Sequence, residues 1–276
     1  MGASLHAILH AHLIPKCPHA DLFNVRGRAW LARQAVPDDE RFAIERHVRE
    51  LDRLAEDLAI LDREIAESTM DDPAIRRLLT ITGVNLTVAA GLMAAIGKVT
   101  RFKSPQKLVS YFGLNPRVRQ SGLGAAHHGR ISKVGRSHAR AMLVEAAWAA
   151  AKTPGPLHAF FVRVRARRGH QVAAVAVARK LAVLVWHMLT KEKDYLWARP
   201  SLVAHKVRGM ELQAGKPQRK GNSRGSTYAY NVKELRNQET HIARKAQESY
   251  ENFVEAWRQR SPKEKARGRL NPARLE

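Results

Sequence analysis

The sequence predicts a mostly α-helical protein: a long coiled-coil or hairpin helix, then a compact helical domain that contains a helix-hairpin-helix-like element. Three observations support this fold class. Apolar residues over 44–65 recur at spacings of three and four, which is the period of a helix seam. Two short apolar stretches flank a glycine-containing turn at 81–85, and the apolar stretch 172–189 is long enough for a core helix. We divide the chain into segments 1–35, 36–72, 73–200 and 201–276.

The first two segments are expected to be helical. Residues 3–13 predict a short helix, and a long helix follows Pro37, because the three acidic residues at 38–40 suit the first turn of a helix. Its charged outer faces are typical of a coiled coil that joins copies of the chain, although a helix packed within one subunit has the same pattern. The seam positions are Ile44, Val48, Leu51, Ala55, Leu58, Leu61 and Ile65.

The third segment opens with two short apolar helices within 74–99. Gly83 allows the tight turn between them. In a helix-hairpin-helix, backbone N–H groups at the start of the second helix meet a phosphate, so Gly83 is a candidate nucleic-acid contact. A plain helical hairpin in a core has the same pattern.

Cap and breaker residues predict the elements that follow. A Ser-Pro pair starts a helix over 104–114, residues 117–136 predict a loop, and Ser137 is expected to cap the next helix. The apolar helix over 170–190 contains Arg179 and Lys180, each costing about 2.5–3.5 kcal/mol at a bilayer centre. We therefore expect a buried helix and no membrane span. The last segment predicts a flexible basic linker at 215–227, a helix over 231–259 and a disordered tail.

The charge of the chain is strongly positive and unevenly distributed. The 276 residues carry 48 Lys and Arg against 25 Asp and Glu, a net charge of +23. Residues 73–191 hold 20 basic side chains and a single acidic one, Glu145. This excess indicates nucleic acid as the partner, with an anionic membrane surface as the alternative. One carboxylate cannot build the two-metal site of a nuclease, which needs three or four, so we assign no metal ligands.

The single cysteine, Cys17, and the absence of an export signal in the opening residues favour the cytoplasm.

Residues 117–140 combine a Ser-Gly pair with many cations and no carboxylate. A serine hydroxyl can attack a phosphodiester if cations stabilise the pentavalent transition state. Three of the five serines in 73–191 fall at predicted helix caps or inside a helix, which leaves Ser121 and Ser132. A Ser-Gly loop that only binds phosphate has the same spacing, and Tyr111 is a rival nucleophile.

Two adjacent histidines, His127 and His128, are candidates for phosphate contact or proton donation, and their roles stay open at this stage. The candidate nucleic-acid contacts are Gly83, Arg117, Arg119, Gly122, Arg130, Lys133, Arg136 and Arg140.

Several linked blocks resemble the C-terminal domain of the IS-110-type (IS-110, IS-116, IS-902) insertion-sequence transposases. The resemblance extends less sharply over about residues 5–260. The blocks are TGVN at 82–85, RFKSPQKLVSYFGLNP at 101–116, Ser121-Gly122, GRISKVG at 129–135 and RAMLVEAA at 140–147.

The resemblance implies a two-part recombinase. In that family an N-terminal resolvase-like domain holds four acidic Mg²⁺ ligands, a coiled coil assembles subunits, and the C-terminal serine forms a phosphoserine link to DNA. A structured guide RNA, the bridge RNA, selects donor and target. Carried over, the serine is Ser121, the partners are DNA and a guide RNA, the chain forms a homo-oligomer, and it acts in a bacterial cytoplasm at the nucleoid.

The resolvase-like domain has no counterpart in this sequence, and residues 1–35 resemble the segment that follows it. We therefore expect a truncated transposase that lacks the metal-binding domain and is inactive alone. The alternative is a non-catalytic DNA- or RNA-binding regulator that acts through the coiled coil.

Overall fold

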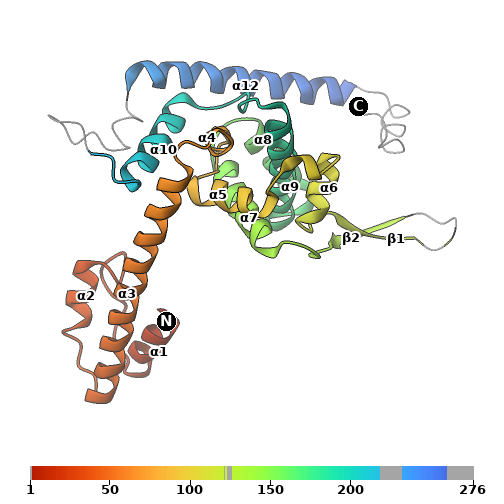
Figure 1. The fold of residues 1–276 in the computed structure, drawn as a ribbon. Helices are drawn as coiled ribbons and strands as arrows, with labels where there is room; N and C mark the ends of the chain where they lie inside the picture. The colour runs from red at the N-terminus through yellow and green to blue at the C-terminus, as the bar shows by residue number, and fades with distance from the viewer. Residues whose placement is uncertain (1, 121, 123–125, 218–231, 260–276) are drawn as a thin grey trace. The chain divides into compact units, whose positions relative to one another are not determined.

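The computed structural model describes residues 2–120, 122, 126–217 and 232–259, without the side chains of 2–4, 128, 253 and 256–259. The fold is mostly helical, as the sequence predicted, and its sheet has two strands within these residues (Figure 1). The chain forms two compact units, residues 1–63 and 64–276. The boundary falls inside the long helix α3 (Asp38–Thr69). The four-segment division made from the sequence stays a prediction.

The N-terminal unit has a small core of its own. Helices α1 (Gly2–Ala11) and α2 (Val25–Leu31) contribute to it together with the first turns of α3. Asn24 caps α2, because its side chain accepts a hydrogen bond from the backbone N–H of Gly27 at 2.7 Å. An ion pair of 2.6 Å joins Arg28 to Asp52. The buried core residues are Leu5, Leu9, Leu22, Leu31 and Ile44.

The predicted seam of α3 has two different surroundings. Ile44 is buried in the core of the N-terminal unit, and Val48 packs against that core. Further along the helix, Leu58 and Leu61 are 59% and 52% exposed. The long helix is therefore present, and Leu58 and Leu61 of its seam are open to solvent, whereas Ile65 is half-buried.

The second unit is built around helix α9 (His170–Lys191), which packs against α4 (Pro73–Leu79), α6 (Pro105–Tyr111), α7 (Ser137–Lys152) and α8 (Pro156–Arg168). Among the described residues, α9 is the one helix long and apolar enough to cross a membrane. One face of α9 is buried in the protein core, as the sequence predicted. The buried residues of that face are Ala173, Ala174, Val177, Ala178, Leu181, Ala182, Val185, Met188 and Leu189.

Helices α4 and α5 (Leu86–Ile96) form a hairpin whose ends follow from capping residues. The side chain of Asp72 accepts from Ala74 N at 2.7 Å, with Pro73 as the first helical residue. The side chain of Asn85 accepts from Val88 N at 2.9 Å and starts α5. Between them, Gly83 has φ +91°, and a Cβ built there would lie 2.3 Å from the carbonyl oxygen of Ala146 in α7. The turn is therefore tight because it packs directly on another backbone.

Lys206 stabilises the same α4–α5 hairpin through its side chain. It belongs to α10 (Pro200–Gln213), a helix that sequence reasoning did not anticipate. The Lys206 Nζ donates to the carbonyl oxygens of Leu79 and Ile81, both at 2.8 Å. Leu79 is the last residue of α4, where carbonyls lack a partner within the helix, whereas the Ile81 carbonyl also accepts from Val84 N at 3.2 Å. Burial lowers the pKa of Lys206 to about 7.

This pKa predicts a pH dependence of stability. Between about pH 7 and pH 10 the unfolded chain holds a proton on Lys206 that the folded chain has released, so stability rises with pH in this window. We expect the wild-type free energy of unfolding to gain about 2 kcal/mol more than that of Lys206→Met between pH 7 and pH 9, at about 1.4 kcal/mol per pH unit for one proton. Urea unfolding at several pH values measures the difference. Equal slopes in the two proteins would contradict the assignment.

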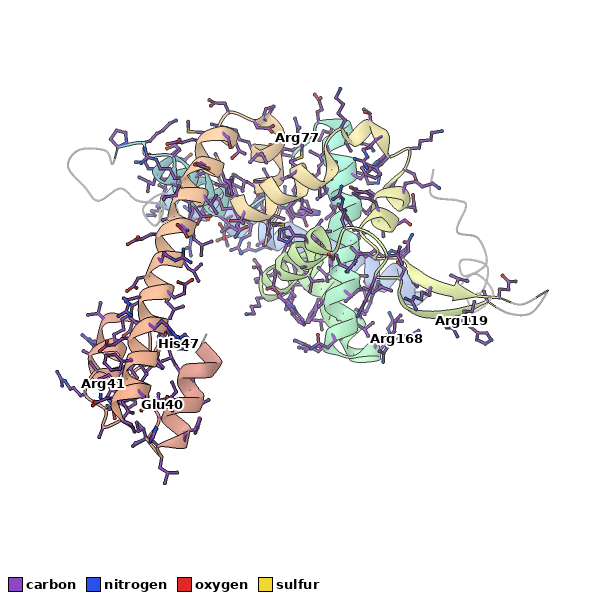
Figure 2. All side chains as sticks on the ribbon, turned by 60° about the horizontal axis from the view of Figure 1, so that its bottom comes forward. Glu40, Arg41, His47, Arg77, Arg119 and Arg168 are labelled. Carbon is purple, nitrogen blue, oxygen red and sulfur yellow. The ribbon has the colours of Figure 1, made fainter. Side chains whose placement is uncertain are left out.

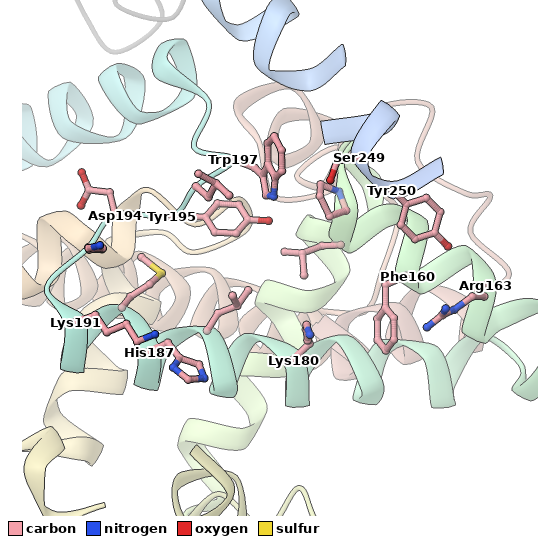
Figure 3. A pocket seen from close by; sticks show the side chains of 16 residues that line it. Phe160, Arg163, Lys180, His187, Lys191, Asp194, Tyr195, Trp197, Ser249 and Tyr250 are labelled. Atoms are coloured by element: carbon pink, nitrogen blue, oxygen red, sulfur yellow. The ribbon is translucent and has the colours of Figure 1, made fainter. Parts of the chain in front are cut away.

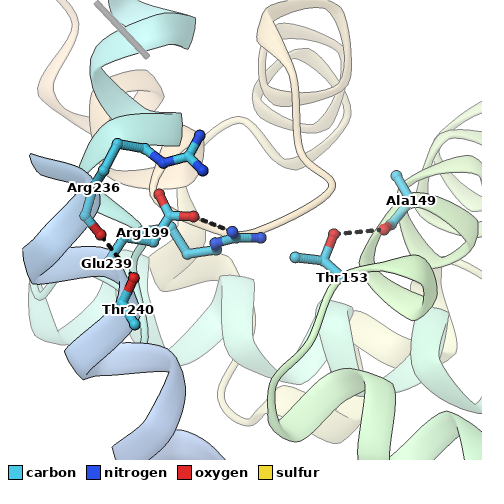
Figure 4. A network of polar contacts seen from close by, with 6 residues as sticks. All are labelled: Ala149, Thr153, Arg199, Arg236, Glu239 and Thr240. Carbon is cyan, nitrogen blue, oxygen red and sulfur yellow. Dashed lines mark hydrogen bonds and ion pairs between the residues drawn. The ribbon is translucent and has the colours of Figure 1, made fainter. Parts of the chain in front are cut away.

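The C-terminal helix α12 (Lys233–Gln259) packs on α8 and α10. Figure 4 shows the ion pair between Arg199 and Glu239, a residue that is 4% exposed. The Tyr250 hydroxyl donates to the Ala159 carbonyl at 3.0 Å. The predicted tail and most of the predicted linker lie outside the described residues.

The loop predicted over 117–136 is wrong in part. Strands β1 (Pro116–Arg119) and β2 (His127–Ile131) form an antiparallel hairpin there, which extends away from the helices of its unit (Figure 1). The strands contain few β-branched residues, so local propensity gave no strand signal. Backbone hydrogen bonds continue beyond the strands, between the residues that precede β1 and those that follow β2. Ser132 N donates to Asn115 O at 2.8 Å, and Lys133 N donates to Gly113 O at 3.1 Å.

Candidate nucleic-acid interface

The β1–β2 hairpin gathers basic side chains from two strands onto one surface. Val118 pairs with His128 and Arg119 with His127, whereas Pro116 pairs with Ile131. This register leaves two residues of β2, Gly129 and Arg130, opposite the single residue Arg117, which is a β-bulge. A bulge twists the strand and redirects its side chains.

A cavity of about 440 Å³ lies along this hairpin. Most of the side chains that line it are basic, and none is acidic. Figure 2 shows Arg119 on the hairpin, apart from the helices. The lining residues are Arg117, Arg119, His127, Gly129, Arg130, Ile131 and Lys133. The arrangement can bind a polyanion through its phosphates without reading a base.

Several of the predicted phosphate contacts hold the base of the hairpin together. Arg140 Nη1 donates to the carbonyl oxygens of Phe112, at 3.0 Å, and Lys133, at 3.2 Å. Arg117 Nη2 donates to the carbonyl of Ser132 at 3.2 Å. These two arginines therefore position the hairpin, whatever contact they also make with a ligand.

Tyr111 lies at the same base, between two arginines. Arg136 Nε donates to the Tyr111 hydroxyl at 2.7 Å, and the hydroxyl donates to Ala95 O at 3.2 Å. The guanidinium carbons of Arg101 and Arg136 lie 4.9 Å and 5.7 Å from its ring centroid. The hydrogen bond from Arg136 lowers the pKa of Tyr111, and burial opposes this effect. Sequence reasoning did not single out Arg101, although it lies in the 101–116 block.

Three predicted contacts remain available to a ligand. The side chains of Arg119, Arg130 and Lys133 have no hydrogen-bond or ion-pair partner in the part of the chain that the structure describes. Lys133 has φ +58°, an unusual backbone conformation for a non-glycine residue. These three cations, with His127, form the exposed basic surface of the hairpin.

Ser121 lies outside the described residues, in the chain segment between β1 and β2. Its neighbour Gly122 is exposed and has φ +59°, and a Cβ built there would meet nothing within 4 Å. The backbone beside the serine is thus open to close approach by a ligand. The side chain of His128 is also outside the described part, and the assignment of Gly83 to phosphate binding stays a prediction beside its packing role.

Two serines that the sequence assigned to helix caps have other roles or no capping bond in the structure. Ser104 occupies the N-cap of α6 but makes no capping hydrogen bond with its side chain. Ser137 is the first residue of α7, and its N-cap is Arg136. The assignment of Ser121 therefore depends on the family resemblance and on its place in the sequence between β1 and β2.

A metal site does not fit the residues of this interface. Among the described residues, no group of three or more His, Cys, Asp or Glu side chains is placed to hold a metal ion. Glu145, the lone acid in 73–191, is exposed on α7.

Comparisons with known proteins place these residues in a family. A probable family 20 transposase of Pseudomonas aeruginosa is 31% identical over 53% of this chain and 44% of its own length. The transposase for insertion sequence element IS1111A of Coxiella burnetii is 31% identical over 44% of the chain and 34% of its own length. A pilin gene-inverting protein of Moraxella bovis is 28% identical over 43% and 37%.

The chain thus spans less than half the length of each of these curated relatives. Residues 75–162, which include the hairpin and the α4–α5 turn, match the model of the IS116/IS110/IS902 transposase family. The similarity of this chain to the IS116/IS110/IS902 transposase family therefore lies in residues 75–162.

Proposed function

We propose that this protein takes part in DNA strand cleavage and exchange during transposition of an insertion sequence, with Ser121 as nucleophile. The observation that carries the proposal is the position of Ser121 in the chain. It lies between two strands whose exposed cations, Arg119 and Arg130, suit a phosphate backbone, within the region that matches the transposase family. The names of two relatives, a probable family 20 transposase and a pilin gene-inverting protein, support the same conclusion.

The proposed reaction is a transesterification. The Ser121 Oγ forms a bond to the phosphorus of a DNA phosphodiester, and the bond from phosphorus to one bridging oxygen breaks. The serine proton leaves with that oxygen, which becomes a DNA hydroxyl. The hairpin guanidinium groups stabilise the extra negative charge of the pentavalent transition state. Strand exchange is the reverse step, in which another DNA hydroxyl attacks the phosphoserine and releases the serine.

The proposal also includes the partners that the family resemblance implies. Mg²⁺ would be held by carboxylates of another domain or subunit, because residues 73–191 hold one acid. A structured guide RNA would select the DNA sites. The test is to incubate the protein with element-end DNA, Mg²⁺ and guide RNA, with and without an added resolvase-like domain, and to look for a denaturant-stable protein–DNA adduct. Binding without any adduct, even with that domain supplied, would favour the non-catalytic regulator.

The exposed cations of the hairpin lead to a prediction about DNA binding. Arg119→Ala and Arg130→Ala should each weaken duplex DNA binding about 3–10-fold and reduce the salt slope by about one, because each removes one phosphate contact. Arg140→Ala should instead lower the free energy of unfolding by about 1–3 kcal/mol, since the carbonyls of Phe112, which is buried, and of Lys133 lose their donor. Anisotropy titrations at several salt concentrations and urea unfolding separate the two effects. An unchanged salt slope in both hairpin variants would count against this surface.

The exposed leucines of the α3 seam lead to a prediction about how copies of the chain associate. We propose that Leu58 and Leu61 pair with a second copy of the chain, because they are exposed leucines on a heptad-like seam. Replacing both with Glu should shift the protein toward monomer, as measured by sedimentation equilibrium. Replacing the exposed Glu56 and Glu67 with Gln provides a control on the same helix. A wild-type protein that is monomeric at micromolar concentration would contradict the pairing.

A further inference from the structure

A second cavity, of about 570 Å³, lies in the C-terminal unit between α8, α9, the segment 193–197 and α12. Figure 3 shows its lining, with Phe160, Arg163 and Tyr250 at one end and Lys191 and Asp194 at the other. The volume falls in the range of about 300–1,000 Å³ that is typical of small-ligand pockets. None of the residues that line the basic hairpin cavity contributes to it.

Four aromatic side chains line this cavity, among aliphatic ones. Phe160, Trp197 and Tyr250 are half-buried, so that part of each ring faces the cavity, and Tyr195 is buried more deeply. Tyr250 is held by its hydrogen bond to Ala159 O. Half-buried aromatic rings with fixed positions provide flat surfaces on which a planar group can stack at low entropic cost.

The rim of the cavity is cationic. Arg163, Lys180, Lys191 and Lys193 line it, against the single acid Asp194. The Arg163 guanidinium carbon lies 5.5 Å from the Phe160 ring centroid, so a cation and an aromatic face stand side by side. Burial, and then the charges of Lys191 and Lys180, lower the pKa of His187, which lines the same cavity. The rim therefore favours an anion.

We propose that this cavity binds an unpaired nucleotide of single-stranded DNA or RNA, with the base stacked against Phe160 or Trp197 and the phosphate at Lys180 and Lys191. Flat aromatic walls beside cations are the chemistry that recognises an unstacked base with its phosphate. A DNA duplex presents its phosphates but not the faces of its bases. The two cavities therefore suit different forms of nucleic acid. The hairpin contacts paired nucleic acid, and this cavity contacts an unpaired strand. The inference rests on the proposed action on nucleic acid, but it needs no chemistry at Ser121.

The test measures binding of fluorescent oligothymidylate and oligouridylate of about 12 nucleotides, within the usual site sizes for single strands, and of a blunt duplex. Trp197→Leu keeps an apolar side chain but loses the flat face, and it should weaken single-strand binding about 10-fold. Trp197→Phe should largely restore it. Lys180→Glu should weaken binding more than Lys107→Glu, which makes the same charge change at an exposed position on α6. Thermal melting of each variant confirms that it folds.

The outcomes separate clearly. Photocrosslinking of 5-iodouracil oligonucleotides to peptides that contain Phe160, Trp197 or Tyr250 would support the site, and the DNA and RNA arms would show which strand it prefers. Equal affinity of Trp197→Leu and wild type, with no crosslink to these peptides, would overturn it. So would an equal loss of duplex binding in Trp197→Leu, or displacement of the oligonucleotide by poly-glutamate at equal charge. Ser121→Ala retains this cavity. If the adduct test fails, single-strand binding at the cavity can therefore still be measured and judged separately.

Discussion

Ser121→Ala should form no covalent protein–DNA adduct under conditions in which the wild type forms one. The substitution removes the Oγ that makes the new bond to phosphorus. Alanine has no side-chain group that can form this bond. Loss of a nucleophile lowers the rate by about 10³-fold or more, so the adduct falls below detection. Affinity for the same DNA should change less than about threefold, because phosphate contacts supply most of the binding energy.

Ser132→Ala is the matched control, since Ser132 is the other serine that the sequence left as a candidate. Its backbone N–H donates to Asn115 O at 2.8 Å, and this bond survives the substitution. The adduct should therefore form at the wild-type rate in Ser132→Ala. Both proteins are assayed with Mg²⁺, guide RNA and a supplied resolvase-like domain, and adducts are resolved on denaturing gels. An adduct of normal yield in Ser121→Ala would assign the nucleophile elsewhere, with Tyr111→Phe as the next variant.

Gly83→Ala should destabilise the C-terminal unit by about 3–5 kcal/mol, a large effect for one methyl group. Two causes act together. The backbone has φ +91°, which an alanine adopts only with strain, and the new Cβ would lie 2.3 Å from Ala146 O and 2.8 Å from Ala150 N. Both contacts are with the backbone of α7, which cannot move aside as a flexible side chain does. The α4–α5 turn would have to separate from α7.

Gly97→Ala is the control for Gly83, because it tests the backbone conformation without the clash. Gly97 has φ +60°, and a Cβ built there meets nothing within 4 Å. Its substitution should cost about 1–2 kcal/mol, the ordinary penalty of a left-handed conformation. Thermal melting and urea unfolding of the two variants measure the difference. Equal losses would show that the turn does not depend on close contact with α7.

The sequence alone determined the features that depend on neighbouring residues. Asp72-Pro73 and Asn85 start α4 and α5 as the capping rules predict, because a cap acts within one helical turn. The period of apolar residues predicted α3, and the apolar run over 172–189 predicted a core helix even though Arg179 and Lys180 interrupt it. The charge count placed the basic region in 73–191, since charge needs no knowledge of the fold.

The tertiary structure decided what depends on residues far apart in the chain. The β1–β2 hairpin was not predicted, because its strands have weak propensity and its base is held by Gly113 and Asn115, which follow α6, and by Arg140 of α7. Sequence spacing treated the basic residues of 117–140 alike, whereas hydrogen bonds commit Arg140 and Arg117 to backbone carbonyls and leave Arg119 and Arg130 exposed.

The second cavity shows the same limit of sequence reasoning. Phe160, Lys180, Trp197 and Tyr250 lie in four separate elements, and no local period or motif connects them. Only packing of α8, α9 and α12 brings their side chains to one surface. Local patterns therefore determined which helices form and where positive charge collects, whereas long-range packing decided which of those charges and aromatic rings can meet a ligand.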